Sequence, residues 1–441
     1  MGGALADVDG YPLPPNLERI ISSCPTELID CVELIAGAGG GAWLVGGAVR
    51  QGILGVMPKD WDLAVDLNPE EMMKIFPDAL ETGLKFGTVT LRRGDFFFEA
   101  TTLRGEGRYG DGRRPDSVEY SKSLAADLAR RDFTFNAMAV DLGRQILHDP
   151  FEGRFDLEAR KLRAVGDAAH RLGEDGLRIM RAYRFLDLGQ GVHCQPDFAL
   201  EQALVSHQYM LDNVARERIW SEFRLILAGN ESAHILRRMA ADGLLARILP
   251  SRWLSKDVGI TAQFHHCLQG IVPEARLALL LVDADFTVIE EGLRKLKLSN
   301  EQIKTTLDHR RWLGTIPLNS PEGVLRRYRA VIGEMMPEQL RIERALAGEV
   351  SDNIDSIHDD FENRLRMLPK LRGGEKPLLD GLKLMEISGL PQGRRLGRLK
   401  DWLFRLQIER DLSDGGEVES LICTLSWQHG DENTWPRLAW P

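Results

Sequence analysis

The hydrophobic pattern of this chain changes near Asp127, and the change limits the folds open to it. Before Asp127, short apolar or alternating runs at residues 42–45, 60–66, 88–92 and 96–103 predict β-strands. After it, apolar residues recur at helical spacing, and the clearest predicted helices cover residues 216–228, 231–246, 274–283, 300–313, 338–347 and 394–409. The pattern predicts an α+β protein with a small mixed sheet first and helices after it.

The composition indicates a folded protein of more than one domain. Of its 441 residues, 43% are hydrophobic and 28% are charged, a balance that allows a buried core. At about 100–200 residues per domain, the length predicts two to four domains. No apolar run approaches the ~18–20 residues of a membrane-spanning helix. Residues 1–16 lack the features of a presequence, and the five cysteines include no Cys-x-x-Cys pair. We therefore expect a cytoplasmic location.

Charge is distributed unevenly along the chain. The whole chain carries a net charge of -10, yet residues 361–410 hold twelve basic and six acidic residues. This stretch is therefore at +6 and the remainder at -16. A basic C-terminal third is consistent with contacts to a phosphate backbone, and a solvated helix face would give the same count.

Two carboxylates lie close together in the segment Lys59–Val65. In a strand, side chains alternate between the two faces, so Asp60 and Asp62 project from one face. Two carboxylates at one spot repel each other unless a divalent cation lies between them, and hard oxygen ligands favour Mg²⁺. Glu99, in the predicted strand 96–103, is a candidate third oxygen ligand, as in two-metal phosphoryl transfer. The alternative is an acidic, solvent-exposed strand edge.

A glycine turn precedes these carboxylates. Residues 44–50 (LVGGAVR) predict a strand, a turn at Gly46 and Gly47, and the start of a helix. Glycines let backbone N–H groups approach an anion closely, and Arg50 can bind phosphate oxygens. A tight turn with positive φ explains Gly46-Gly47 equally well. Taken together, the two segments predict a site for a nucleoside triphosphate and a metal ion.

These segments also carry a family resemblance. Residues 46–50 followed by 59–64 resemble the head-domain signature of class II tRNA nucleotidyltransferases, the CCA-adding enzymes of the polymerase β superfamily, which also includes bacterial poly(A) polymerases. Three more segments resemble further motifs of the family: residues 130–139 (RRDFTFNAMA), 149–157 (DPFEGRFDL) and 174–178 (EDGLR) with Arg181 and Arg184. Residues 215–219 and 243–245 resemble the neck region of the family. Gln51 departs from the family, which usually has Asp there.

The resemblance implies a domain order and roles for particular residues. It implies a polymerase-β-like nucleotidyltransferase head at 31–150, a nucleobase-selecting neck at 151–235 and a helical, tRNA-binding body and tail at 236–441. Residues 1–30, with four prolines, are expected to be a loose lead-in. The implied catalytic residues are Asp60, Asp62 and Glu99, with Asp60 and Asp62 as metal ligands. The implied nucleotide-binding residues are Gly47, Arg50, Arg131, Asp175, Arg178, Arg181 and Arg184.

Within this set, Asp175 and Arg178 would select the base. Residues 174–186 can form an amphipathic helix, and Asp or Glu to Arg pairs at helical spacing are also ordinary stabilisers. In the family, the Asp and first Arg of this motif hydrogen-bond the edge of CTP or ATP. A carboxylate accepts from the exocyclic amino group of either base, whereas UTP and GTP would leave it unpaired.

The resemblance implies a template-independent RNA nucleotidyltransferase that adds CCA to the 3′ end of tRNA from CTP and ATP, with Mg²⁺ as cofactor. The segment 105–115 resembles the flexible loop of full CCA-adding enzymes, which favours terminal A addition. Three alternatives remain: an enzyme that adds only CC or only A, a poly(A) polymerase, and a non-catalytic RNA-binding protein. The sequence leaves the oligomeric state open.

Overall fold

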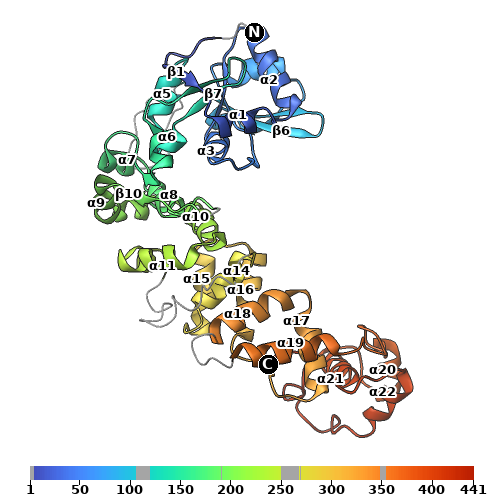
Figure 1. Ribbon diagram of the computed structural model, residues 1–441. Helices are drawn as coiled ribbons and strands as arrows, with labels where there is room; N and C mark the ends of the chain where they lie inside the picture. The colour runs from blue at the N-terminus through green and yellow to red at the C-terminus, as the bar shows by residue number, and fades with distance from the viewer. Residues whose placement is uncertain (1–3, 106–119, 190, 250–267, 269, 348–353) are drawn as a thin grey trace. The chain divides into compact units, whose positions relative to one another are not determined.

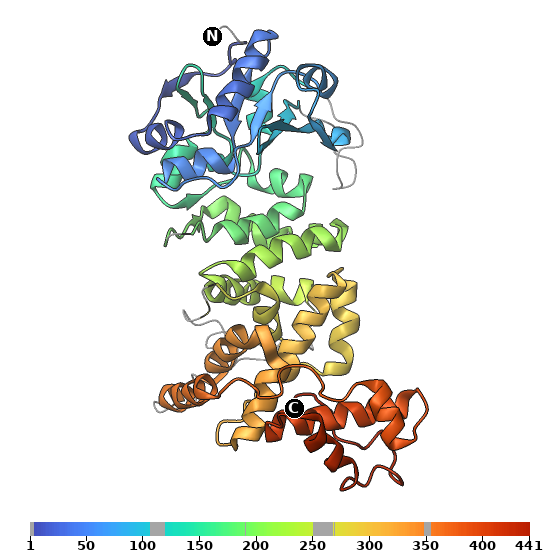
Figure 2. The same ribbon diagram turned by 90° about the vertical axis from the view of Figure 1, so that its right-hand side faces the viewer.

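The chain divides into two compact units, residues 1–226 and 227–441. The computed structural model in Figures 1 and 2 describes residues 4–105, 120–189, 191–249, 268, 270–347 and 354–441. The segment expected to be a flexible loop lies almost wholly outside the described residues. The division into head, neck and body stays a prediction, and each unit is described by itself.

The first unit is built on an eight-stranded mixed sheet, which confirms the predicted fold class. Its strands are β1 (Gly10–Pro12), β2 (Ala42–Val45), β3 (Leu63–Val65), β4 (Leu80–Gly83), β5 (Thr88–Arg93), β6 (Phe96–Thr102), β7 (Ala139–Asp141) and β8 (Ile146–His148). Their order is β1-β8-β7-β2-β3-β6-β5-β4. Only the β3–β6 pair is parallel within this sheet. Because β2 and β3 are antiparallel, the residues after β2 and before β3 lie at the same edge.

Helices surround this sheet and continue beyond it. They are α1 (Pro15–Ile21), α2 (Thr26–Gly37), α3 (Gly47–Ile53), α4 (Pro69–Ile75), α5 (Leu124–Ala129), α6 (Gly153–Glu158), α7 (Ala168–Glu174), α8 (Leu177–Phe185), α9 (Phe198–Ser206) and α10 (Arg216–Ala228), with 3₁₀ turns η1 (Leu84–Phe86), η2 (Thr134–Asn136) and η3 (Gln208–Asn213). A two-stranded parallel sheet joins β9 (Lys161–Leu162) to β10 (Gln195–Pro196).

The expectation of a loose lead-in at residues 1–30 is wrong. β1 pairs with β8, and α1 and α2 begin at Pro15 and Thr26. Proline is tolerated at the first turn of a helix, where its missing N–H has no partner in any case, so Pro15 starts α1. Leu17, Ile20 and Ile21 are buried, which anchors the segment in the unit.

All four residues of β2 are buried, and Trp43 is 1% exposed. Val45, Ala64 and Leu128 belong to the same apolar cluster as Trp43. The cluster therefore ties the central strands to α5 and fixes the part of the sheet on which the glycine turn and the carboxylates lie.

The second unit is helical, as predicted. Its described helices are α11 (Ser232–Ala241), α12 (Leu244–Ile248), α14 (Pro273–Leu280), α15 (Phe286–Lys295), α16 (Asn300–Trp312), α17 (Glu322–Ile332), α18 (Met336–Ala347), α19 (Ile354–Met367), α20 (Gly381–Ser388), α21 (Arg394–Arg410) and α22 (Gly415–Ile422), with the 3₁₀ turn η6 (Gly333–Met335). The single helix predicted at 231–246 is instead two, because Gly243 has a φ of 78° and separates them.

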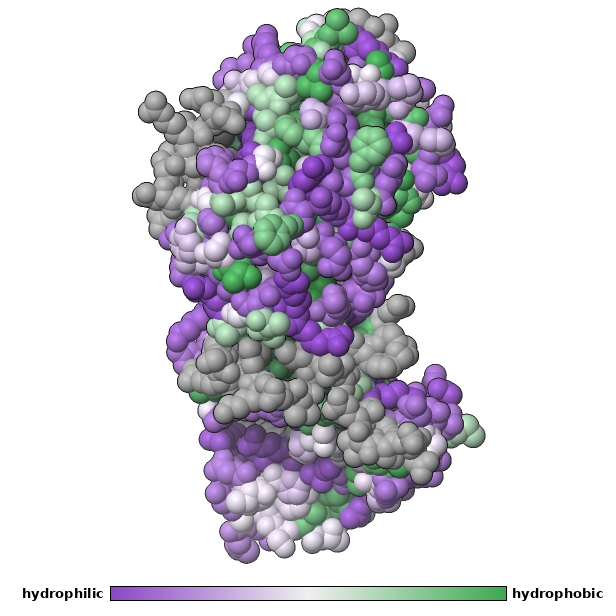
Figure 3. All heavy atoms as spheres, turned by 60° about the vertical axis from the view of Figure 1, so that its left-hand side comes forward, coloured by the Kyte–Doolittle hydropathy of each residue, from purple (hydrophilic) through white to green (hydrophobic). Residues whose placement is uncertain are grey.

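The surface of the molecule is mainly polar on the face drawn in Figure 3, where apolar side chains are scattered among hydrophilic ones. Among the described residues, no helix combines the length and the apolar character needed to cross a membrane. The four described cysteines, Cys24, Cys31, Cys194 and Cys423, form no disulfide.

Candidate active site

One cavity of about 730 Å³ in the first unit brings the predicted site residues together. All ten of them line it: Gly47, Arg50, Asp60, Asp62, Glu99, Arg131, Asp175, Arg178, Arg181 and Arg184. They come from segments that are far apart in the sequence. The fold therefore converges on the residues that the sequence motifs singled out, and their roles stay predictions.

The carboxylates Asp60 and Asp62 lie just before β3, which begins only at Leu63. The predicted strand at 60–66 is thus shorter than expected, but Val45 donates its N–H to the carbonyl of Asp62 at 3.0 Å and extends the pairing by one residue. Both residues line the cavity.

The charge on Asp62 is disfavoured where it stands. Burial, together with the nearby charges of Glu99 and Asp60, raises the pKa of Asp62 to about 6, although the charge of Arg131 lowers it. A divalent cation would relieve this repulsion, and carboxylate oxygens are ligands that Mg²⁺ accepts. The residues present therefore fit a hard divalent cation.

Glu99 does not complete a ligand set of three with these two aspartates. Within the described part of the chain, no three or more His, Cys, Asp or Glu side chains form a group that could hold a metal ion. The expectation of a third protein ligand is therefore not met. Divalent cations such as Mg²⁺ are commonly bound by one or two carboxylates together with the phosphates of a substrate, so a pair such as Asp60 and Asp62 remains a candidate site for a divalent cation.

The glycine turn forms another part of the cavity wall. Gly46 has a φ of 68°, which residues with a Cβ rarely adopt, and Gly47 is the first residue of α3. A Cβ built on Gly46 would lie 3.7 Å from a terminal nitrogen of Arg131. The turn therefore lets its backbone lie close to the guanidinium of Arg131 in the cavity wall.

The basic side of the cavity consists of arginines, most of them held by a carboxylate. Asp127 accepts from Arg130 at 2.6 Å and from Arg131 at 2.9 Å. Burial would raise the pKa of Asp127, but the charges of Arg131 and Arg130 lower it. Sequence reasoning missed Asp127 as a site residue, although its spacing of three and four residues from the two arginines was visible.

Arg181 and Arg184 are held from two directions. Asp132 accepts from Arg181 at 2.6 Å, and Glu222 of α10 accepts from Arg184 at 2.6 Å and from Arg181 at 3.4 Å. Burial would raise the pKa of Asp132, but Arg181 and the donor groups of Asn136 and Phe133 lower it to about 2. Asp132 is thus a fixed negative charge between basic groups.

Arg50 has a different environment, without a direct carboxylate partner among its described contacts. It donates to the amide oxygen of Asn136, and its guanidinium lies 4.9 Å from the ring centroid of Phe185. Burial lowers the pKa of Arg50 to about 10, and the charge of Arg184 lowers it as well. Since Asn136 also donates to Asp132 at 3.0 Å, the amide links Arg50 to that carboxylate.

The predicted base selectors lie at a break between two helices. The single helix expected at 174–186 is wrong: α7 ends at Glu174, Asp175 is extended, and α8 begins at Leu177. Gly176 lies between the two helices and packs closely against the η3 turn, because a Cβ there would lie 2.5 Å from the carbonyl oxygen of Met210. The predicted apolar stripe of α8 is nonetheless buried.

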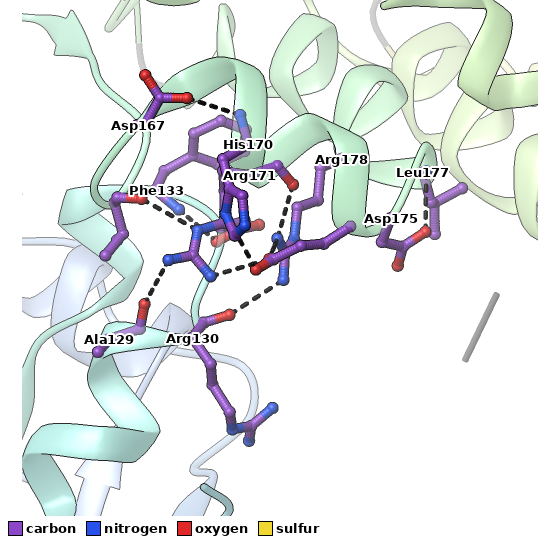
Figure 4. Close-up of polar contacts among 12 residues, drawn as sticks. Ala129, Arg130, Phe133, Asp167, His170, Arg171, Asp175, Leu177 and Arg178 are labelled. Carbon is purple, nitrogen blue, oxygen red and sulfur yellow. Dashed lines mark hydrogen bonds and ion pairs between the residues drawn. The ribbon is translucent and has the colours of Figure 1, made fainter. Parts of the chain in front are cut away.

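Both selectors are fixed by neighbouring groups, and Figure 4 shows Arg178 directed toward the carbonyl of Arg130. Arg178 donates to this carbonyl at 3.0 Å, to the carbonyl of Arg171 at 2.7 Å and to Glu174. Asp175 accepts from the N–H of Leu177 at 3.0 Å and pairs with Arg218 of α10 at 2.8 Å.

Comparison with known proteins defines the class of the first unit. Residues 42–163 match the model of the "Poly A polymerase head domain", and residues 195–253 match the "Probable RNA and SrmB- binding site of polymerase A". The first match covers strands β2 to β8 and the cavity residues from Gly47 to Arg131. It does not reach Asp175, Arg178, Arg181 or Arg184. The fold of this part of the chain is therefore that of a poly(A) polymerase-type head domain.

Relatives that match most of the chain narrow this class. The CCA-adding enzyme of Geobacillus stearothermophilus is 32% identical over 394 residues, which cover 89% of this chain and 94% of that enzyme. The enzyme of Lactococcus lactis is 35% identical over 65% of this chain and 73% of its own. The crystal structure of the Bacillus stearothermophilus CCA-adding enzyme in complex with CTP is similar, with a TM-score of 0.72, 28% identity and coverage of 93% and 98% of the two chains. The chain belongs to the family of CCA-adding enzymes.

Proposed function

We propose that this chain adds cytidine, cytidine and adenosine to the 3′ end of tRNA, using CTP and ATP without a nucleic-acid template. The observation that carries the proposal is the single cavity in which Asp60, Asp62 and Glu99 lie together with seven arginines. Acidic groups suit a divalent cation and arginines suit a triphosphate. Family membership, through relatives named for CCA addition, supports the choice of reaction.

Different residues of the cavity would have different roles in nucleotidyl transfer. Asp60 and Asp62 would hold the cation, which we propose is Mg²⁺. When bound, it would supply charge neutralisation at the phosphates and acidity at the attacking hydroxyl. Glu99 raises the negative potential at the same place, as its effect on the pKa of Asp62 indicates. Arg131 and Arg184 would orient phosphate oxygens, since each is already fixed by a carboxylate.

Base choice follows from the hydrogen-bonding capacity left at Asp175 and Arg178. A carboxylate has about four lone-pair positions and a guanidinium has five N–H groups. Asp175 can therefore accept from the exocyclic amino group of cytosine or adenine while it stays paired with Arg218. Uracil presents a carbonyl there, which would face the carboxylate with no donor between them.

The RNA would be bound mainly by the second unit, through its backbone and shape. We keep the division into a head at 31–150, a neck at 151–235 and an RNA-binding part at 236–441 as part of the proposal. The basic stretch 361–410 contributes less than its charge suggests, since Arg364, Arg395 and Arg398 donate to backbone carbonyls of their own unit. RNA affinity should still fall as salt rises. The cytoplasmic location also stays a prediction, which cell fractionation would test.

The experiment uses three tRNA transcripts that end in the discriminator base, in C and in CC, each incubated with CTP alone, ATP alone and both. We expect CTP to extend the first two and ATP to extend the third by one nucleotide. Extension of any transcript by ATP alone into a long tail would show a poly(A) polymerase. Failure on the third transcript would show an enzyme that adds only CC.

A variant separates catalysis from RNA binding. Asp62→Asn should lower incorporation at least about 100-fold, whereas Asp78→Asn, an exposed position of the same unit, should not. Incorporation should stop with EDTA and return with Mg²⁺. Unchanged incorporation by Asp62→Asn would place catalysis at a different site, whereas no incorporation by the wild type would leave the RNA-binding alternative.

A further inference from the structure

An exposed aromatic side chain shares a sheet face with the candidate active site. Side chains alternate along a strand, so Phe97, Glu99 and Thr101 of β6 project to one face. Glu99 and Thr101 line the cavity. Phe97 does not, and it is 56% exposed. Its strand neighbour Arg92 lies across from it on β5, with the guanidinium 6.0 Å from the ring centroid.

The opposite face of the same hairpin gives a contrast. Phe96 and Phe98 stack there with ring centroids 6.1 Å apart, and Phe98 is 2% exposed. Leu91, the partner of Phe98 on β5, is fully buried. Core packing therefore accounts for Phe98, on which the 42% exposed ring of Phe96 stacks, and it does not account for Phe97 on the other face.

In-line transfer restricts where the RNA enters, given the proposed function on which this inference rests. The attacking and leaving oxygens lie roughly in line across the reacting phosphorus. The glycine turn after β2 and Arg131 lie on the β2 side of the carboxylates, and they suit the departing pyrophosphate. Since the sheet order runs β2-β3-β6-β5, the attacking 3′-hydroxyl should approach from the side of β6 and β5. This part of the sheet lies away from β1, toward the edge strand β4 (Figure 1).

We propose that Phe97, supported by Arg92, stacks on a base at the 3′ end of the RNA acceptor. Two residues of strand span about 7 Å, which is about two base steps of 3.4 Å. A base on Phe97 would therefore be within one or two nucleotides of the reacting end near Glu99. Aromatic stacking suits acceptors that end in different bases, because every base has a π-face. Arg92 adds charge complementary to the RNA backbone.

The test compares Phe97→Ala with Phe96→Ala, which removes the same ring from the other face of the same strand. Loss of one stacked base should raise the KM for a tRNA minihelix ending in CC about 5- to 150-fold. The KM for ATP should stay within about twofold. Phe96→Ala should leave the KM for RNA unchanged, and Phe97→Trp should restore it. Equal KM values for RNA in Phe97→Ala and the wild type would overturn the proposal.

Abasic acceptors test stacking directly, by fluorescence anisotropy without turnover. The last two nucleotides of the minihelix are replaced one at a time by an abasic residue. At one of the two positions, the replacement should weaken binding to the wild type and leave binding to Phe97→Ala unchanged. Equal losses in both proteins would exclude a stacked base. A change only in the oligomeric state of Phe97→Ala, measured by sedimentation, would assign the ring to a contact between copies. If the wild type adds no nucleotide, the proposed function fails, and these binding data still decide the role of Phe97.

Discussion

Asp132→Asn should damage the nucleotide site without removing any residue expected to contact the metal ion. Asp132 is 7% exposed and accepts from Arg181, Asn136 and the N–H of Phe133. Its ordinary pKa of 3.8 falls to about 2, which corresponds to about 2 kcal/mol of stability at neutral pH. Because the folded-state pKa is lowered, this contribution is present above pH 3.8 and is lost as the pH falls through 2.

The amide introduced by Asp132→Asn would present a donor where Arg181 needs an acceptor. Removing one partner of a buried ion pair costs about 3–5 kcal/mol, but Glu222 also pairs with Arg181 at 3.4 Å and reduces the loss. We therefore expect the first unit to lose about 2–3 kcal/mol. The same change should raise the KM for CTP about tenfold, since Arg181 and, through Asn136, Arg50 lose their fixed positions.

Stability should be measured by hydrogen exchange with peptide-resolved mass spectrometry, because a chain of two units does not unfold in one transition. Peptides from α8 should exchange faster in Asp132→Asn at pH 7.5, while peptides from α21 should not change. Asp78→Asn is the matched control, since it removes an exposed charge from the same unit. Protection of α8 equal to that of the wild type would refute the assignment of Asp132 as the group that holds the arginines.

Three further changes address other parts of the molecule. Asp175→Asn should lower the ratio of kcat/KM for CTP to kcat/KM for UTP about tenfold or more, because the amide can donate to the uracil carbonyl. Competition assays with both nucleotides measure this ratio, and an unchanged ratio would contradict base selection by Asp175. Gly153→Ala should lower the stability of the first unit by about 1–3 kcal/mol, because the added Cβ would lie 2.2 Å from the carbonyl oxygen of Thr134. Hydrogen exchange measures this loss, and protection equal to that of the wild type would contradict the predicted clash. Burial raises the pKa of Glu343 to about 7, so the wild-type second unit should lose up to about 3 kcal/mol as the pH rises from 4.5 through 7. Glu343→Gln should remove this pH dependence. If the pH profiles of hydrogen exchange in α18 are parallel for the wild type and Glu343→Gln, the buried carboxyl of Glu343 is not the cause.

Local sequence patterns were enough where a structure depends on neighbours in the chain. The glycine turn and the pair Asp60 and Asp62 were predicted from segments of fewer than ten residues, and the fold places them at one edge because β2 and β3 are antiparallel. The strands β7 and β8 were missed. Each is three residues long, and a turn with Gln145 at a φ of 55° joins them. Such short strands are defined by pairing with partners, which no local pattern reveals.

Long-range partners also explain the missed residues of the candidate site. Glu222 is 38 residues from Arg184, and Arg218 is 43 residues from Asp175. Their role depends on α10 packing beside α8, so the sequence pattern predicted a helix there and nothing about its polar face. The need for glycine at position 176 has the same origin, because it comes from the carbonyl of Met210.

The arrangement of charge in the cavity explains why so many carboxylates accompany the arginines. Seven arginines line it, and without partners they would repel one another. The pKa of Arg50 is lowered first by burial and then also by the charges of Arg184 and Arg181. Five carboxylates, those of Asp127, Asp132, Glu174, Asp175 and Glu222, cancel five of these charges and fix the side chains, which leaves two positive charges for a triphosphate. Asp60, Asp62 and Glu99 form a separate acidic group that suits a cation. Because the two groups lie in one cavity, nucleotide and metal ion should each bind more tightly when the other is present. Calorimetric titration of CTP with and without Mg²⁺ measures this coupling, and equal affinities would show that the two groups act independently.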